Sequence, residues 1–226
     1  MNRPSPLDDP AARAARAWAH SARFIVTASR IEELPEPGVP EVAFVGRSNA
    51  GKSSAINALA QHKQLAFASR TPGRTQHINL FGLGPADAPD ALWTDLPGYG
   101  FAAVERQAKQ RWQAVMAQYL AQRHSLAGLV MLVDSRHGFT ALDQQLLEYV
   151  WPRVASGEVK LLVLLTKADK IGRREGERAL ADAQGVLGAM ATEHSDIGVV
   201  LFSALSGQGL DDVALALRSW VSSEQD

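Results

Sequence analysis

The feature that most constrains the fold of this chain is a stretch bracketed by glycines, GRSNAGKS, at residues 46–53. It follows an apolar run, EVAFV (41–45), and precedes a helix-like run, SSAINALAQ (53–61). The stretch fits the pattern G-x-x-x-x-G-K-[ST] at every position. In a loop between a strand and a helix, successive backbone amides and the helix N-terminus can face one anion. The sequence therefore predicts a phosphate-binding loop, with a chance glycine turn as the alternative.

Apolar runs elsewhere in the chain predict the rest of a sheet. Four runs are uninterrupted, which is typical of strands covered on both faces in a parallel sheet: 41–45, 128–134, 159–166 and 197–204. Two runs that alternate more predict a hairpin (77–83 and 91–96), and 23–29 predicts an additional N-terminal strand. Helical patterns separate the strands at 53–61, 102–124, 140–155, 174–191 and 210–223. This order indicates a three-layer, doubly wound α/β fold whose sheet is mostly parallel with one antiparallel hairpin edge.

Length and composition bound the domain organisation. The chain has 226 residues and no long Ser/Gly- or Pro-rich linker, so we expect a single domain over residues 23–223. Residues 1–22 are expected to be a flexible, partly helical lead-in, with an organelle transit peptide as the alternative, and residues 224–226 a tail. The absence of cysteine excludes disulfides, thiolate zinc sites and a cysteine nucleophile. No apolar run approaches the roughly 20 residues of a membrane span, and a net charge of −1 does not point to DNA.

Each residue type in the phosphate loop has an expected task. Gly46 and Gly51 let the backbone curl around a phosphate. Lys52 reaches the β- and γ-phosphates, and the Ser53 hydroxyl binds Mg²⁺. The nucleotide contacts expected from this segment are Gly46, Arg47, Ser48, Asn49, Ala50, Gly51, Lys52, Ser53 and Ser54.

A carboxylate near Mg²⁺ is expected from DLPG, at residues 95–98. Asp95 ends an apolar strand and is expected to hold the ion through water. The Gly98 amide is then free to bond a γ-phosphate oxygen, so its position reports whether that phosphate is present.

A second hydroxyl for the metal is expected from the loop ASRTPGRTQH, at residues 68–77. Thr75 is favoured over Thr71 because it lies directly before a predicted strand, whereas Thr71 is held in a turn. Gly73 of this loop is expected near the nucleotide, and an ordinary surface turn is the alternative. The expected metal ligands are Ser53, Thr75 and Asp95.

The base is indicated by TKAD, at residues 166–169, which directly follows a predicted strand. The Asp169 carboxylate can accept hydrogen bonds from the ring N–H and the amine of guanine, a donor pair that adenine lacks. The stem of Lys167 can cover the base plane, and Thr166 replaces the more usual asparagine. SALSGQG (203–209) ends the next predicted strand. The expected base contacts are Thr166, Lys167, Asp169, Ser203, Ala204 and Leu205.

Together these motifs resemble those of the translation-factor-related P-loop GTPases, and more narrowly those of the EngB (YihA/YsxC) family of ribosome-biogenesis GTP-binding proteins. The resemblance is carried by PEVAFVGRSNAGKSSAINAL, RTPGRTQHINLF, DLPGYGFA and LLTKADK. It extends from about Arg23 to Trp220 and implies the P-loop GTPase fold. It also implies a cytoplasmic bacterial GTPase that assists assembly of the large ribosomal subunit, with a large-subunit precursor (ribosomal RNA or protein) as partner. Family members have also been linked to cell division and septation.

Hydrolysis of GTP to GDP and phosphate is expected to depend on Lys52, Thr75, Gly98 and Asn49. Many small GTPases place a glutamine directly after D-x-x-G to orient the attacking water, but this chain has Tyr99 there. A tyrosine with a pKa of about 10 is a poor base, so we expect slow intrinsic turnover that a partner or a cation raises. Related GTPases with asparagine in this loop position bind K⁺ beside the phosphates. By that analogy Asn49 binds K⁺, and the alternative is that it only braces the loop.

Several alternatives stay open at this point. A non-switching guanine-nucleotide module with vestigial hydrolysis is compatible with Tyr99, whereas TKAD argues against an ATP-dependent phosphotransferase. Five basic residues flank the two presumed switches and either contact ribosomal RNA or lie on solvated faces: Arg70, Arg74, Arg106, Lys109 and Arg111. The protein is expected to be a monomer.

Overall fold

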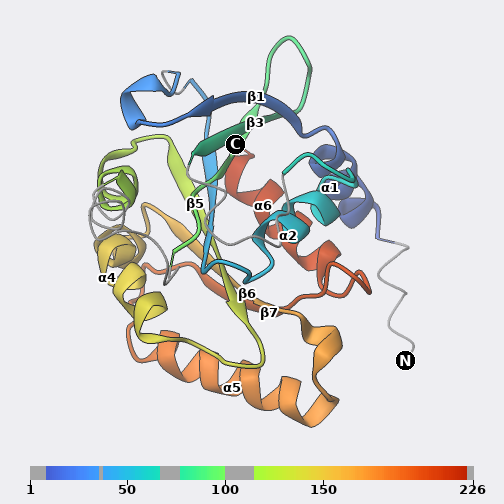
Figure 1. Ribbon diagram of the computed structural model, residues 1–226, viewed down its shortest axis with the longest axis vertical. Coiled ribbons are helices and arrows are strands. Elements are labelled where there is room, and N and C mark those ends of the chain that lie inside the picture. The colour runs from blue at the N-terminus through green and yellow to red at the C-terminus, as the bar shows by residue number, and fades with distance from the viewer. Residues whose placement is uncertain (1–8, 36–37, 67–76, 100–114, 223–226) are drawn as a thin grey trace.

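The fold is centred on one seven-stranded sheet with the strand order β1-β3-β4-β2-β5-β6-β7 (Figure 1). It is seen in a computed structural model that describes residues 9–35, 38–66, 77–99 and 115–222. The strands are β1 (Arg23–Ala28), β2 (Glu41–Gly46), β3 (Ile78–Leu83), β4 (Ala91–Asp95), β5 (Leu126–Asp134), β6 (Lys160–Thr166) and β7 (Ile197–Leu201). All seven lie where apolar runs of the sequence predict strands.

The strand directions agree with the predicted fold class. Strand β3 is antiparallel to both of its neighbours, β1 and β4. The pairs β4–β2, β2–β5, β5–β6 and β6–β7 are all parallel. Only β3 therefore runs against the other strands, because the β3–β4 hairpin reverses the chain where the other connections cross over. The hairpin and the additional N-terminal strand are both confirmed.

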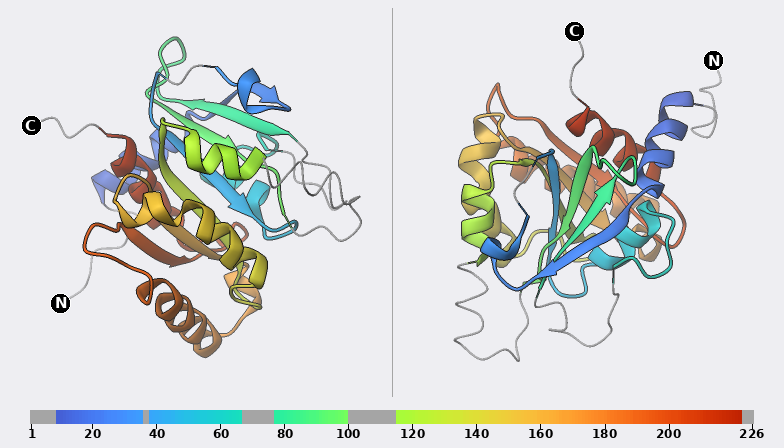
Figure 2. Two further views of the ribbon diagram at one scale, coloured as in Figure 1. Left: turned by 90° about the vertical axis from the view of Figure 1, so that its left-hand side faces the viewer. Right: turned by 90° about the horizontal axis from the view of Figure 1, so that it is seen from above.

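Helices cover both faces of the sheet and make three layers (Figure 2). The helices are α1 (Pro10–His20), α2 (Lys52–Leu59), α4 (Ala141–Ala155), α5 (Arg173–Gly188) and α6 (Leu210–Val221), with short 3₁₀ turns η2 (Ile31–Glu33) and η3 (Ala168–Lys170). Helices α4 and α5 and the helical residues 115–122 pack on one face, and α1, α2 and α6 on the other. Successive side chains of β2 alternate between the two cores, so Ala43 contributes to the first and Phe44 to the second.

Two elements differ from what the sequence predicts. The run 197–204 is uninterrupted and apolar, yet all five residues of β7 are only partly buried, because β7 is the outermost strand of the sheet. Residues 1–22 are expected to be a flexible lead-in, yet α1 packs against α6 and buries Trp18 and Ala19. The described part of this segment therefore belongs to the core.

No helix within the described ranges is long and apolar enough to cross a membrane.

Candidate functional site

The glycine loop connects the end of β2 to the start of α2, as predicted. Gly51 caps α2 with φ of 97° and no side-chain hydrogen bond. This left-handed conformation strains any residue with a Cβ. The first helical bond runs from Ala55 N to Gly51 O, so the amides of residues 52–54 have no acceptor within the helix. These amides and the positive end of the helix dipole favour an anion at this place.

Lys52 and Asp95 meet at the edge of the sheet where β2 and β4 end. The two strands are parallel neighbours, and Phe44 pairs with Asp95, so the sheet brings the DLPG carboxylate beside the glycine loop. Lys52 Nζ forms an ion pair with Asp95 Oδ1, and both side chains are almost fully buried. Ser53 follows Lys52 directly in α2, and a hydroxyl and a carboxylate are oxygen donors of the kind that Mg²⁺ prefers, so the chemistry of Ser53 and Asp95 fits the expected metal.

The DLPG loop is bonded directly to the glycine loop. Ser48 N donates to Tyr99 O at 2.8 Å, and Tyr99 N donates to Gly46 O at 3.3 Å. A Cβ added to Gly98 would lie 3.3 Å from Ser48 N, so only glycine allows this close approach without displacement. The structure thus brings Gly98 against the phosphate loop, and its γ-phosphate contact stays a prediction.

The first two residues of TKAD also contact the phosphate loop. The Thr166 hydroxyl donates to Ala50 O at 2.6 Å. Lys167, in the left-handed region with φ of 59°, donates from Nζ to Asn49 O at 2.7 Å. Thr166 and Lys167 therefore brace the loop that lies before α2, a role that the sequence does not predict for them.

Asp169 is held by the turn that follows β7. Ser203 Oγ donates to Asp169 Oδ1 at 2.7 Å, so Ser203, which the sequence predicts as a base contact, supports the side chain of Asp169. This hydrogen bond, with a further one from Lys170, lowers the pKa of Asp169 despite some desolvation, so the acceptor stays charged near neutral pH. Ala204 and Leu205 follow in the same turn, and Leu205 is 80% exposed.

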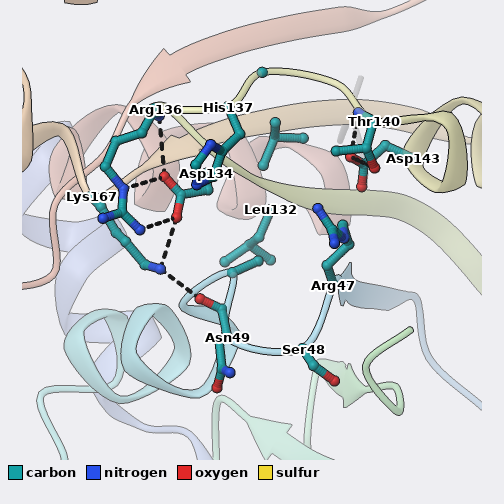
Figure 3. Close-up of a pocket in the computed structure, with 13 residues that line it drawn as sticks. Arg47, Ser48, Asn49, Leu132, Asp134, Arg136, His137, Thr140, Asp143 and Lys167 are labelled. Atoms are coloured by element: carbon teal, nitrogen blue, oxygen red, sulfur yellow. Dashed lines mark hydrogen bonds and ion pairs between the residues drawn. The ribbon is translucent and has the colours of Figure 1, made fainter. Parts of the chain in front are cut away.

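Asp134, at the end of β5, is a site residue that the sequence analysis does not assign. Its carboxylate accepts hydrogen bonds from Lys167 Nζ at 2.8 Å and from Arg136 Nη2 at 2.7 Å (Figure 3). Burial favours a higher pKa for Asp134, but the hydrogen bonds from Arg136 and Lys167 outweigh it and lower the pKa. The available signal was a carboxylate directly after an apolar strand, the same signal that identifies Asp95.

A cavity of about 240 Å³ lies beside the glycine loop (Figure 3). Its walls come from Arg47–Ala50, from the β5 end and the loop after it, and from Lys167. Asn49 lies at its rim with φ of 66°, and its side chain points away from Lys167 and Asp134 in Figure 3. The backbone carbonyl of Asn49 therefore braces the loop, while its exposed side chain is directed elsewhere.

Some sequence-predicted residues lie outside the described ranges. They are Gly73 and the metal ligand Thr75 with its alternative Thr71, and the basic residues Arg70, Arg74, Arg106, Lys109 and Arg111. The other predicted contacts lie at the carboxyl ends of four parallel strands, β2, β4, β6 and β7. They come from Gly46–Ser54, from Asp95 and Gly98, from Thr166–Asp169 and from Ser203–Leu205.

These features define a P-loop GTPase: the mostly parallel sheet, the glycine loop before α2, and the two loops that carry Asp95 and Asp169. A family model described as "50S ribosome-binding GTPase" matches residues 41–167. The chain belongs to the EngB family of GTP-binding proteins. It is 54% identical over 203 residues to the "Probable GTP-binding protein EngB" of Albidiferax ferrireducens, covering 90% of this chain and 94% of that protein. The protein of the same name from Acidovorax ebreus is 56% identical over 203 residues, covering 90% and 89%.

Solved structures share the fold at lower sequence identity. A crystal structure of a probable GTP-binding protein EngB matches with a TM-score of 0.53 at 17% identity, covering 80% of this chain and 98% of that one. Era from Aquifex aeolicus bound to GDP·AlF₄⁻ matches with a TM-score of 0.62 at 21% identity, covering 82% of this chain and 57% of that one.

Proposed function

We propose that the protein binds GTP with Mg²⁺ and hydrolyses it to GDP and phosphate. The change between its GTP-bound and GDP-bound conformations would act as a switch in assembly of the bacterial large ribosomal subunit. One observation supports nucleotide binding: Lys52, Asp95 and Asp169 all lie at the carboxyl ends of the parallel strands. Lys52 and Asp95 form an ion pair, and Asp169 accepts a hydrogen bond from Ser203. Residues 23–223, together with α1, act as one GTPase domain.

The residues divide the work by position. The amides at the start of α2 and the Lys52 ammonium bind and orient the phosphates. Ser53 and Asp95, with Thr75, would hold Mg²⁺, which neutralises charge on the β- and γ-phosphate oxygens when bound. Gly98 senses the γ-phosphate, and Asp169 selects guanine. The Ser203 turn positions Asp169 before the base arrives, so little ordering remains to be done on binding.

Calorimetric titration with GTP, GDP and ATP tests the nucleotide assignment. We expect both guanine nucleotides to bind and ATP to give no measurable heat, because adenine offers no donor pair to Asp169. Equal binding of ATP would instead support the ATP-dependent phosphotransferase.

The position of Tyr99 supports the proposal of slow intrinsic turnover. Its hydroxyl donates to Asp143 Oδ1 at 2.6 Å and is buried, so it is directed into the core and cannot orient a water on the γ-phosphate. A partner or a cation must then supply what glutamine supplies elsewhere. Fast turnover of the isolated protein in a sodium buffer would contradict this.

We propose K⁺ as that cation, with Asn49 as one of its ligands. The side chain of Asn49 is exposed at the rim of the loop, and its backbone carbonyl, not its side chain, accepts the hydrogen bond from Lys167. GTPase rates in K⁺ and in Na⁺ should differ for the native protein and agree for Asn49→Ala. Equal rates in the two salts for the native protein would leave Asn49 with a bracing role only.

The large-subunit precursor is proposed as partner because the family model is described as a 50S ribosome-binding GTPase. The protein would act as a cytoplasmic monomer, and a link to septation would be indirect through ribosome supply. Cosedimentation with large-subunit particles should be stronger with a non-hydrolysable GTP analogue than with GDP. Equal cosedimentation in both nucleotides would favour the non-switching module.

A further inference from the structure

Tyr99 is held by a carboxylate from another element. Its side chain is 3% exposed, and Asp143, in the first turn of α4, is 1% exposed. Burial, followed by the charge and hydrogen bond of Asp143, raises the pKa of Tyr99, against a smaller lowering by the charge of Arg47. The hydroxyl therefore stays protonated and continues to donate to Asp143.

Asp143 is itself fixed by the start of α4. Its Oδ2 accepts hydrogen bonds from Thr140 N at 2.7 Å and from Thr140 Oγ1 at 2.6 Å, and the bond from Thr140 N is the one that an acidic side chain at this position makes in a capping box. Its Oδ1 accepts from Tyr99. Both oxygens are thus engaged, and the helix terminus sets the direction in which the carboxylate meets Tyr99.

The backbone of Tyr99 is held from the opposite side by the phosphate loop. Ser48 N donates to Tyr99 O at 2.8 Å, and Arg47 forms a parallel bridge with Tyr99. In Figure 3 the Arg47 side chain points toward Thr140 and Asp143. Tyr99 is thus held at its hydroxyl by Asp143 and at its backbone by Ser48. Gly98 directly precedes Tyr99, so loss of either contact changes where the Gly98 amide lies.

We propose that Asp143 is a positioning residue for the γ-phosphate sensor: through the Tyr99 hydroxyl it holds the Gly98 amide at the phosphate loop. This inference rests on the proposed function, since it assigns a task to that site's sensor. GDP lacks the γ-phosphate, so loss of the Tyr99–Asp143 contact weakens binding of a triphosphate while binding of GDP is retained.

The test is the ratio of the GDP dissociation constant to that of a non-hydrolysable GTP analogue, measured by calorimetry. Tyr99→Phe and Asp143→Asn should each lower this ratio about tenfold, within the usual range of coupling between sites. The double variant should lower it no further, because both changes remove the same contact. The single-turnover rate should fall in parallel, with unchanged affinity for GDP.

The two other tyrosines are matched controls. The Tyr119 hydroxyl is also buried and donates to a carboxylate, Glu41 Oε2 at 2.6 Å, while Tyr149 is 41% exposed on α4. Tyr119→Phe should lower the urea midpoint and Tyr149→Phe should not, and neither should change the affinity ratio. Thr140→Val removes one hydrogen bond to Asp143 at the start of α4 but leaves the Tyr99 hydroxyl in place. It therefore tests the contribution of the α4 terminus separately from the contact with Tyr99.

Two results would overturn the proposal: an unchanged ratio in Tyr99→Phe, or equal losses of affinity for GDP and the analogue, which indicate a structural role alone. Should Tyr99→Phe fail to fold, the ratio in Asp143→Asn decides by the same criterion. Failure of the native protein to bind guanine nucleotides is a separate result that counts against the proposed function itself.

Discussion

At the scale of single residues, Thr166, Lys167 and Asp169 are near neighbours in sequence but act on different partners. Thr166 and Lys167 donate to carbonyl oxygens of Ala50 and Asn49 in the phosphate loop, and Asp169 accepts from Ser203 in the turn after β7. The tetrapeptide TKAD thus contacts both the phosphate loop and the turn after β7. In the proposed function, Asp169 is the member of the tetrapeptide whose carboxylate distinguishes guanine from adenine.

Asp169→Asn should lower GTP affinity about 100-fold, because two hydrogen bonds to a charged acceptor are weakened or lost. The same change should improve binding of xanthosine triphosphate, since the asparagine amide can donate to the carbonyl that replaces the guanine amine. Titration of both nucleotides measures the exchange of specificity. Asp182→Asn, an exposed change on α5, is the matched control and should leave both affinities unchanged.

At the scale of elements, α1 is attached to the domain by its own polar contacts. Trp18 Nε1 donates to Asp90 Oδ1 at 2.8 Å, and Arg218 Nη1 of α6 donates to Asp90 Oδ2 at 3.0 Å. The Arg218 guanidinium also lies over the Trp18 ring, 5.2 Å from its centroid. Asp90 lies directly before β4, so this cluster joins the N-terminal helix to the hairpin and the C-terminal helix.

Trp18→Ala should lower the free energy of unfolding by about 3–5 kcal/mol, the usual cost of removing a large buried aromatic side chain. Urea denaturation at pH 7 measures the change. Arg13→Ala, an exposed substitution on the same helix, should have little effect. If Trp18→Ala is no more destabilising than Arg13→Ala, α1 is the loosely attached lead-in that the sequence suggests.

At the scale of the whole molecule, buried tyrosines make stability depend on alkaline pH. Burial and a neighbouring carboxylate raise the pKa of both Tyr99 and Tyr119 above the ordinary value of 10.0. The folded state therefore retains protons that the unfolded chain releases above about pH 10. The stabilisation is complete below that pH and is lost as the pH rises further.

The free energy of unfolding, obtained from urea denaturation, should accordingly fall above pH 10 with a slope of about 1.4 kcal/mol per pH unit for each hydroxyl. Tyr99→Phe should reduce this slope by about 1.4 kcal/mol per pH unit, the contribution of one hydroxyl. The urea midpoint of the variant near pH 7 should itself be lower than that of the native protein. A slope identical to that of the native protein would show that the Tyr99 hydroxyl ionises in the folded state.

Acid pH also lowers stability, through Asp134. Burial opposes ionisation of this carboxylate, but hydrogen bonds from Arg136 and Lys167 lower its pKa below the ordinary value of 3.8. The stability that it contributes is present above that value and is lost as the pH falls through it. Asp134→Asn should therefore flatten the acid side of the urea midpoint profile, measured against Asp182→Asn.

Local patterns predicted most of the fold because each depends on a few adjacent residues. Uninterrupted apolar runs located the strands, and the helical pattern over 140–155 located α4 (Ala141–Ala155). The exposed position of β7 and the packing of α1 escaped prediction, since both depend on which elements become neighbours. Local sequence does not say that β7 is outermost or that α6 receives α1.

By itself the sequence predicted the chemistry of the site from short runs of consecutive residues: a phosphate loop, the carboxylate that ends β4 and, in the proposed function, a guanine-selecting Asp169. Only the tertiary structure decided which groups position that chemistry. Asp134 braces Lys167 and Asp143 receives the Tyr99 hydroxyl across 44 positions of the chain. The physical reason is that motifs are fixed by local backbone geometry, whereas the contacts that orient them are made by strand order and helix packing. GRSNAGKS specifies a phosphate loop, and its neighbours in space hold that loop in place through hydrogen bonds.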